Sequence, residues 1–247
     1  MVLAGQYLER SVVVGDLDAL YHRGTREPPC AIAAPHPALG GSMLSPVVAE
    51  LAWALTRAGH PTMRFDYRGV GSSRGVSRHE AAARRIVDLR DEVEDLLAVS
   101  DQLIATTGMK PVCAVGYSFG AAVALEAAGK EAIGQLVLIA PPTQLLDFGA
   151  LASVQKPTLV VCAHLDPYCD RGALRLPPTG RLEVIPHADH FFGRGLTEMG
   201  KTVAAWLRVD RAESVAPSDE GATGAKPLEF DLDPGDARPL ELEEDPE

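Results

Sequence analysis

Short apolar runs alternate with helix-like segments along most of this chain, and this alternation constrains its fold more than any other feature. Nearly continuous apolar runs, which are typical of strands buried on both faces, occupy residues 30–34, 111–118, 135–142, 157–166 and 181–187. Helical apolar spacing, or a run of small residues that suits a helix, occupies residues 43–59, 82–108, 119–130 and 196–209. Strands that alternate with helices predict a parallel sheet covered on both faces.

Two further segments complete the expected sheet. Residues 8–22 alternate well enough for a β-hairpin with its turn near Gly15 and Asp16, and residues 61–69 form another strand candidate. The predicted fold class is therefore α/β, with a mostly parallel sheet of about eight strands and helices on both faces. About 17 residues separate the strand that ends at Ala140 from the strand that starts at Thr158, which is too few for an inserted cap domain.

Negative charge is concentrated at the C-terminal end. Residues 210–247 contain 13 acidic and 3 basic residues, a net charge of −10, whereas the formal charge of the whole chain is −11. Residues 1–209 are thus nearly neutral, which argues against a nucleic-acid-binding surface. Few large apolar residues, several prolines and the acidic load predict that residues 210–247 form a disordered tail beside a domain of residues 1–209. The simplest interpretation is a solvated tail, and the alternative is a segment that docks a protein partner.

Neither a membrane span nor a disulfide framework is expected. No stretch approaches the roughly 18 consecutive apolar residues of a membrane helix, and the first 15 residues lack a basic leader with an apolar core. The cysteines Cys30, Cys113, Cys162 and Cys169 form no CxxC pair and no ligand-like group with histidines. These features predict neither a structural disulfide nor a metal site, and they favour a reducing cytoplasm as the location.

The segment VGYSFGA places Ser118 in the pattern G-x-S-x-G. A strand-like run precedes it and a helix-like run follows it, which is the context of a nucleophile elbow. Such a turn lifts the serine clear of the sheet, and Gly116 and Gly120 avoid collisions with the neighbouring strand and helix. A serine hydroxyl is a good nucleophile only when a base accepts its proton, so a histidine is required nearby. The alternative interpretation is a glycine-rich packing turn with an idle serine.

Around this elbow, from about Tyr7 to Leu207, the chain resembles the α/β-hydrolase superfamily. FDYRGVGSSRG looks like the superfamily's D-x-R-G-x-G-x-S loop after the fourth strand. PHPALGG and HADHFF look like segments of a small uncapped bacterial branch close to dienelactone hydrolases, although Ala34 replaces the first histidine of its HPHP-x-x-GG loop. The resemblance implies an α/β-hydrolase fold without a cap domain and a triad in the chain order serine, acid, histidine.

Two histidines follow the final predicted strand, where the family pattern places the base. His190 is preferred because H-F-F matches the family segment, and His187 is the alternative. For the acid, Asp166 occupies the family's G-x-x-D slot with Ala163 in place of the glycine, and Asp170 is the alternative. A buried carboxylate at that position would fix the imidazole tautomer and stabilise the imidazolium.

Other polar residues near these motifs receive simpler interpretations. His36 belongs to the loop after the third strand, and His164 lies in the strand that carries the acid. Asp189, next to the preferred base, is expected to face solvent. GVGSSRG lacks the third glycine and the lysine that a phosphate-binding loop requires, so it is expected to be a turn that closes a strand. Asp66 and Arg68 are expected to hold this loop in place by hydrogen bonds.

An oxyanion hole needs two backbone N–H donors. The amide of Phe119, directly after the nucleophile, is one candidate. The second should come from PHPALGG, where the prolines have no N–H. Ala38 or Leu39 can supply it, with Ala38 slightly preferred, and Gly40 and Gly41 would let the loop bend toward the elbow.

These features predict a serine hydrolase of the EC 3.1 class that cleaves a small-molecule carboxylic ester or thioester through an acyl-enzyme. No metal or organic cofactor is implied, and the lack of a cap predicts an open site. The alternatives are an acyltransferase or peptidase that uses the same triad, and a non-catalytic adaptor that recruits a partner through the acidic tail.

Overall fold

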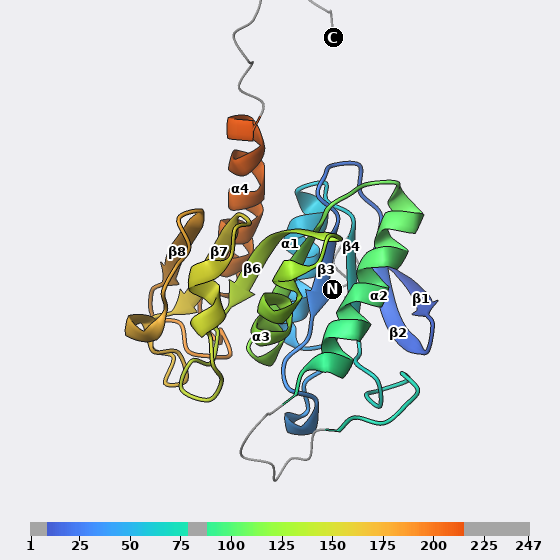
Figure 1. The fold of residues 1–247 in the computed structure, drawn as a ribbon, viewed down its shortest axis with the longest axis horizontal. Helices are drawn as coiled ribbons and strands as arrows, with labels where there is room; N and C mark the ends of the chain where they lie inside the picture. Colours follow the sequence, from blue (N-terminus) through green and yellow to red (C-terminus); the bar gives the residue numbers. More distant parts are fainter. Residues whose placement is uncertain (1–8, 79–87, 215–247) are drawn as a thin grey trace, which may run out of the picture. The chain divides into compact units, whose positions relative to one another are not determined.

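One sheet organises residues 9–78 and 88–214, the part of the chain that the computed structural model describes, with side chains described as far as Arg208. Eight strands within these ranges follow the order β1-β2-β4-β3-β5-β6-β7-β8 (Figure 1). Their bounds are β1 Arg10–Val14, β2 Leu17–His22, β3 Cys30–Ala33, β4 Thr62–Phe65, β5 Val112–Tyr117, β6 Ile133–Ile139, β7 Thr158–Ala163 and β8 Gly180–Ile185. β2 is antiparallel to both β1 and β4, whereas all other neighbours are parallel. The predicted mostly parallel α/β sheet is confirmed.

The central strands are buried on both faces, as their continuous apolar runs predict. Every residue of β3, β5 and β7 is buried. Along β5, successive side chains point to opposite faces: Val112 and Ala114 join one apolar cluster, whereas Cys113 and Val115 join the other. The sheet therefore separates two cores.

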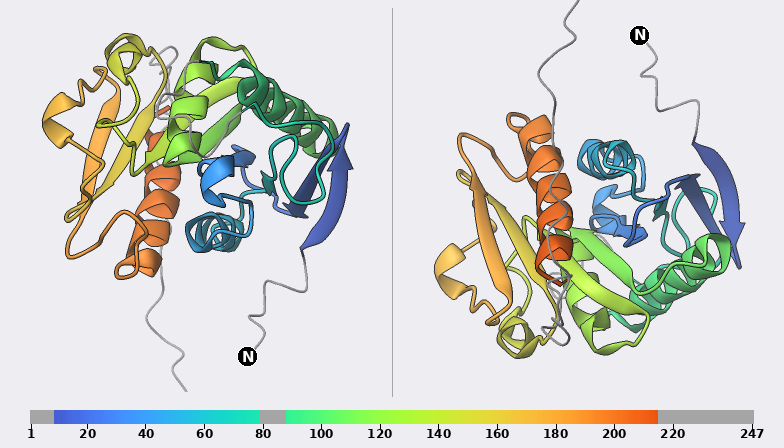
Figure 2. Two further views of the ribbon diagram at one scale, coloured as in Figure 1. Left: turned by 90° about the horizontal axis from the view of Figure 1, so that it is seen from below. Right: turned by 90° about the horizontal axis from the view of Figure 1, so that it is seen from above.

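Four α-helices within the described residues cover these two cores: α1 Pro46–Arg57, α2 Arg90–Thr107, α3 Phe119–Glu126 and α4 Leu196–Ser214. α2 and α3 pack on one face of the sheet, and α1 and α4 pack on the other (Figure 2). Short 3-10 helices occupy η2 Pro37–Leu39, η3 Ala127–Gly129, η4 Gly149–Ser153 and η5 Arg171–Ala173. The expected helix at residues 82–108 thus corresponds to α2, and its first part lies in residues 79–87, outside the described residues.

The segment between β6 and β7 is fully described, and its one helical turn is η4. It contains no cap domain, as its length predicts.

α4 ends at Ser214, five residues beyond the helix expected from the sequence. The remainder of the predicted acidic tail, residues 215–247, lies outside the described residues, so its disorder and the domain boundary stay predictions.

The loop after β4 is held by buried hydrogen bonds. Asp66 Oδ1 accepts the Met43 N–H at 2.7 Å, and Asp66 O accepts the Ser73 hydroxyl at 2.7 Å. The Arg68 guanidinium donates to Asp95 Oδ1 from Nε at 2.9 Å and from Nη2 at 2.6 Å. These contacts tie the loop to the chain before α1 and to α2, so Asp66 and Arg68 have the structural role that the sequence predicts.

Within the described ranges, no helix combines the length and the apolar character needed to cross a bilayer.

Candidate active site

Ser118 stands at a sharp turn between β5 and α3. Its backbone angles, φ 54° and ψ −114°, match the first central residue of a type II′ turn, a conformation that costs a non-glycine residue about 1–3 kcal/mol. The turn fits because its neighbours lack side chains: a Cβ on Gly116 would overlap the backbone of Gly120, and a Cβ on Gly120 would overlap the carbonyl of Ala33. The local sequence thus holds the serine in a strained position above the sheet.

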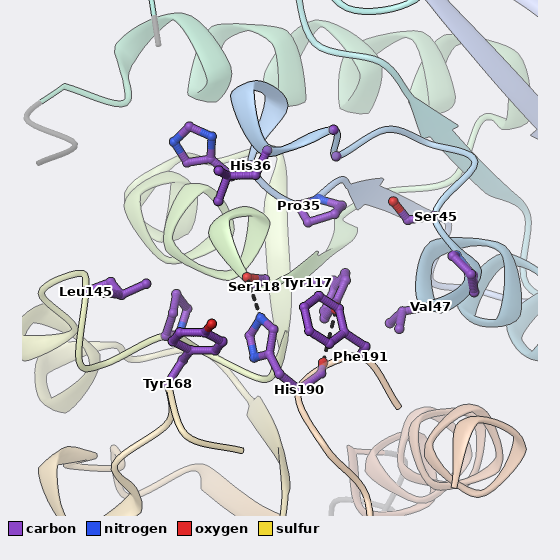
Figure 3. A pocket seen from close by; sticks show the side chains of 15 residues that line it. Pro35, His36, Ser45, Val47, Tyr117, Ser118, Leu145, Tyr168, His190 and Phe191 are labelled. Atoms are coloured by element: carbon purple, nitrogen blue, oxygen red, sulfur yellow. Dashed lines mark hydrogen bonds between the residues drawn. The ribbon is translucent and has the colours of Figure 1, made fainter. Parts of the chain in front are cut away.

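Ser118, His190 and Asp166 form a continuous hydrogen-bonded series. Ser118 Oγ lies 3.0 Å from His190 Nε2 (Figure 3), and His190 Nδ1 lies 2.8 Å from Asp166 Oδ2. The three residues follow the carboxyl ends of β5, β8 and β7, respectively, and these strands are parallel members of one sheet. Residues that are 24 to 72 positions apart in the chain therefore meet at a single edge.

Burial controls how this series is oriented. The side chain of Asp166 is fully buried, and that of His190 is nearly so. A carboxylate can only accept, so it holds the imidazole proton on Nδ1 and leaves Nε2 free to accept the proton of Ser118 Oγ. Asp166 Oδ1 in turn accepts the backbone N–H of Tyr168 at 2.8 Å, which fixes the rotation of the carboxylate.

Tyr117 holds the backbone of His190 in place. The Tyr117 hydroxyl donates to the backbone carbonyl of His190 at 3.0 Å, and the centroids of the tyrosine and imidazole rings are 5.8 Å apart. Burial, with a smaller contribution from the negative charge of Asp166, raises the pKa of Tyr117 well above its ordinary value. The hydroxyl therefore stays protonated and can serve as a permanent donor. No sequence motif marks Tyr117 as a functional residue, although it directly precedes the serine.

The alternative acid and base lie elsewhere. His187 is exposed. Asp170 is exposed and caps η5 by accepting the Gly172 N–H at 2.9 Å. Asp189, expected to face solvent, is exposed and accepts the Gly193 N–H at 3.0 Å.

The expected oxyanion donors have distinct surroundings. Phe119 begins α3, so its amide belongs to the N-terminal turn of that helix. The Ala38 N–H donates to His36 Nδ1 at 3.2 Å, and the Leu39 N–H donates to the His36 carbonyl at 3.1 Å. Either loop amide would have to share or exchange this bond to reach a substrate oxygen, and its role as a donor stays a prediction. The imidazole of His36 also packs 4.9 Å from the Phe119 ring, so this histidine, assigned from sequence only to a loop, lies at the site.

A pocket of about 450 Å³ opens beside the serine hydroxyl. Its walls come from loops after β3, β5, β6, β7 and β8 and from the start of α1. In Figure 3, Leu145 and Tyr168 lie on one side of the Ser118–His190 pair, and Phe191 and Val47 lie on the other. Among the residues that the structure describes, none that lines the pocket is Asp, Glu, Lys or Arg.

Large apolar side chains that face solvent are concentrated at this pocket. Leu39, Leu145, Tyr168 and Phe191 all line it, and each is between 39% and 74% exposed. The rings of Tyr168 and Phe191 also pack edge-on against the imidazole of His190, with ring centroids 4.9 and 5.4 Å apart, respectively. Isolated exposed apolar residues are common, but a group around a pocket marks a binding surface. No periodicity in the sequence identifies these residues, because they lie on separate loops.

Among the described residues, no group of three or more His, Cys, Asp or Glu side chains has an arrangement that could hold a metal ion.

Comparison with known proteins agrees with this architecture. A family model described as serine aminopeptidase, S33, matches residues 38–147. An alpha-beta serine hydrolase homologue from Coxiella burnetii is 28% identical, with 84% of this chain and 99% of that chain covered and a TM-score of 0.67. An α/β serine hydrolase without lid from Xanthomonas campestris is also 28% identical, with coverage of 81% and 94% and a TM-score of 0.67.

A dienelactone hydrolase from Anabaena variabilis is 26% identical, with 81% of this chain and 96% of that chain covered and a TM-score of 0.64. Sheet order, the missing lid and these similarities agree with one another, and the chain belongs to the α/β-hydrolase superfamily.

Proposed function

We propose that this hydrolase cleaves carboxylic esters or thioesters through an acyl-enzyme formed on Ser118. The observation that carries the proposal is the hydrogen-bonded series from Ser118 Oγ through His190 to the buried carboxylate of Asp166. A hydroxyl with its base at 3.0 Å beside an apolar pocket is the arrangement that nucleophilic acyl transfer requires.

In the first half-reaction, Ser118 Oγ attacks the carbonyl carbon while His190 Nε2 takes its proton. Asp166 stabilises the imidazolium that forms. Collapse of the tetrahedral intermediate breaks the bond to the leaving group, and His190 returns the proton to that group as an alcohol or thiol. In the second half-reaction, His190 removes a proton from water, the resulting hydroxide attacks the acyl-enzyme, and the free acid leaves as Ser118 regains its proton.

The negative charge on the carbonyl oxygen needs N–H donors. We assign the Phe119 amide and one of the amides of Ala38 and Leu39 to this role. The N-terminal end of α3 adds a favourable partial positive charge for the developing oxyanion. Loss of one such donor typically lowers turnover by on the order of 100-fold or more.

The composition of the pocket favours substrates that are uncharged beside the scissile bond. An acyl group with an ammonium or a carboxylate would lose hydration there, and it would meet no oppositely charged side chain among the described lining residues. This property disfavours removal of an N-terminal amino acid, the activity named in the matched family model, because a free α-ammonium needs a carboxylate partner. A neutral ester that is apolar on both sides of its carbonyl fits this pocket of about 450 Å³ better.

The test is labelling by a fluorophosphonate probe together with hydrolysis of p-nitrophenyl butyrate. Ser118→Ala should abolish both, because the probe phosphonylates an activated serine. Ser153→Ala is the matched control, since Ser153 is an exposed serine on η4 outside the pocket. Undiminished labelling or turnover by the Ser118 variant would refute the proposal, and leucine p-nitroanilide should be a poor substrate of the native protein.

A further inference from the structure

Two buried thiols lie in contact beside the proposed acid. Cys162 Sγ and Cys169 Sγ are 3.1 Å apart, and neither cysteine is in a disulfide. Cys162 belongs to β7 and is fully buried, whereas Cys169 follows in the next loop and is 8% exposed. The spacing of these two cysteines matches no cysteine motif, so the sequence predicts no link between them.

The two thiols bracket the acid. Asp166 lies between them in the chain, and the intervening loop also holds Tyr168, whose N–H orients the Asp166 carboxylate. The ring of Tyr168 contacts the His190 imidazole at 4.9 Å. A change at Cys169 is therefore one residue away from a group that touches both the acid and the base.

The position of each cysteine indicates which part of the chain would move if the two sulfur atoms formed a bond. A disulfide requires about 2.05 Å between the sulfur atoms, so the present separation of 3.1 Å must shrink by about 1 Å. β7 is paired with β6 on one side and with β8 on the other, where Cys162 is in register with Val184. Since the strand is fixed on both sides, we expect the movement to fall on the loop that carries Cys169 and Tyr168.

We propose that Cys162 and Cys169 are a site of reversible thiol oxidation, at which a peroxide converts the pair to a disulfide that displaces the Asp166 loop and lowers turnover. The effect on turnover rests on the proposed function of Ser118, whereas formation of the disulfide does not. A displacement of about 1 Å in a group that orients the base can cost on the order of 100-fold in rate.

The chemistry proceeds in two balanced steps. Hydrogen peroxide oxidises the Cys169 thiol to a sulfenic acid and is reduced to water. The Cys162 sulfur then attacks the Cys169 sulfur. The S–S bond forms as the S–O bond breaks, and the proton of the Cys162 thiol passes to the departing hydroxide, which leaves as a second water. A dithiol reductant reverses the change by supplying two electrons and two protons.

The difference in exposure between the two thiols places the first step at Cys169. The hydrogen bond with Cys169, together with burial, raises the pKa of the Cys162 thiol. A fully buried thiol is a poor first target for an oxidant, and only Cys169 of the pair has any exposed surface. Cys162 is instead placed to resolve a sulfenic acid that forms in contact with it.

The experiment uses the full-length protein, reduced and then exposed to graded hydrogen peroxide. After oxidation, the number of thiols that can be alkylated under denaturing conditions should fall from four to two. Peptide mapping should find a cross-link between Cys162 and Cys169. Hydrolysis of p-nitrophenyl butyrate should fall about 10- to 100-fold in kcat/KM and return with dithiothreitol.

Two variants and one matched control make the assignment specific. Cys169→Ala and Cys162→Ala should each retain activity when reduced and resist the reversible loss after peroxide. Cys30→Ala removes another fully buried strand thiol, and it should still form the cross-link and lose activity as the native protein does.

Each possible failure of the experiment has a separate meaning. Four free thiols after oxidation, or a cross-link between other cysteines, would overturn the modification site. A complete Cys162–Cys169 disulfide with unchanged kcat/KM would overturn the regulation. Absence of any Ser118-dependent hydrolysis would count against the proposed function, while the thiol count would still decide whether the site exists.

Discussion

Replacement of Asp166 by Asn should reverse the tautomer of His190, and the structure shows why. Asp166 Oδ1 accepts the Tyr168 N–H at 2.8 Å, and Oδ2 accepts from His190 Nδ1 at 2.8 Å. An asparagine must keep its carbonyl oxygen on the Tyr168 amide, because an NH₂ group there would face another donor. Its NH₂ would then donate to Nδ1, and the ring proton would move to Nε2, which faces Ser118 Oγ.

The magnitude follows from what the base loses. An imidazole with its proton on Nε2 cannot accept the serine proton, and the negative charge that stabilises the imidazolium is also gone. This combination costs about 10⁴-fold in kcat, which corresponds to about 5 kcal/mol of transition-state stabilisation. Folding should survive, because an amide is close in shape to a carboxylate and retains the bond to Tyr168.

The assay is the kcat/KM for p-nitrophenyl butyrate at pH 8, with Ser118→Ala as the baseline and thermal unfolding as the check on folding. Asp170→Asn is the matched control, since Asp170 is the neighbouring acid that caps η5, and it should retain near-native activity. A loss of less than tenfold in a folded Asp166→Asn variant would show that Asp166 does not orient the base.

Three further outcomes follow from other contacts. Tyr117→Phe leaves the buried His190 carbonyl without its hydrogen-bond donor. The free energy of unfolding measured by urea denaturation should therefore fall by about 1–3 kcal/mol, and kcat should also be lower. Burial raises the pKa of Asp66 above its ordinary value of 3.8. A raised folded-state pKa means that this group's contribution to stability is lost as pH rises from about 4 through the folded pKa. Asp66→Asn can still accept the Met43 N–H, and it should lack this loss when the free energy of unfolding is compared at pH 4 and pH 7. Longer acyl chains should raise kcat/KM by up to about fourfold per methylene until the pocket is filled, and Leu145→Asp should weaken this dependence in a p-nitrophenyl ester series.

Controls for these variants come from residues of similar exposure. Leu44 is 65% exposed and lies outside the pocket, whereas Leu145 is 61% exposed and lines it. Leu44→Asp should therefore keep the native chain-length dependence. An equal effect of both aspartates would contradict the assignment of Leu145 to the binding surface, and a pH dependence that persists in Asp66→Asn would place its origin in another group.

The strands and the turn at Ser118 could be predicted from the sequence, because they depend on residues that are neighbours in the chain. The apolar runs of β3, β5 and β7 predicted strands buried on both faces, and all their residues are buried. Gly116 and Gly120 predicted the tight turn at Ser118, since only missing side chains permit the backbone contacts found there. The seventeen residues after Ala140 predicted that no cap is inserted, and none is present in that segment.

Tertiary structure decided which polar groups meet. The sequence offered two histidines and two acids. Packing brought His190 and Asp166 into the series with Ser118, whereas His187 is exposed and Asp170 caps the start of η5. The amides of Ala38 and Leu39 were candidates from the absence of proline, yet the folded loop directs both to His36. The paired thiols of Cys162 and Cys169 and the apolar walls of the pocket were likewise visible only in three dimensions. The physical reason is that strands and turns depend on short-range sterics and the spacing of apolar side chains, whereas a hydrogen bond between distant residues depends on how the sheet brings separate loops to one edge.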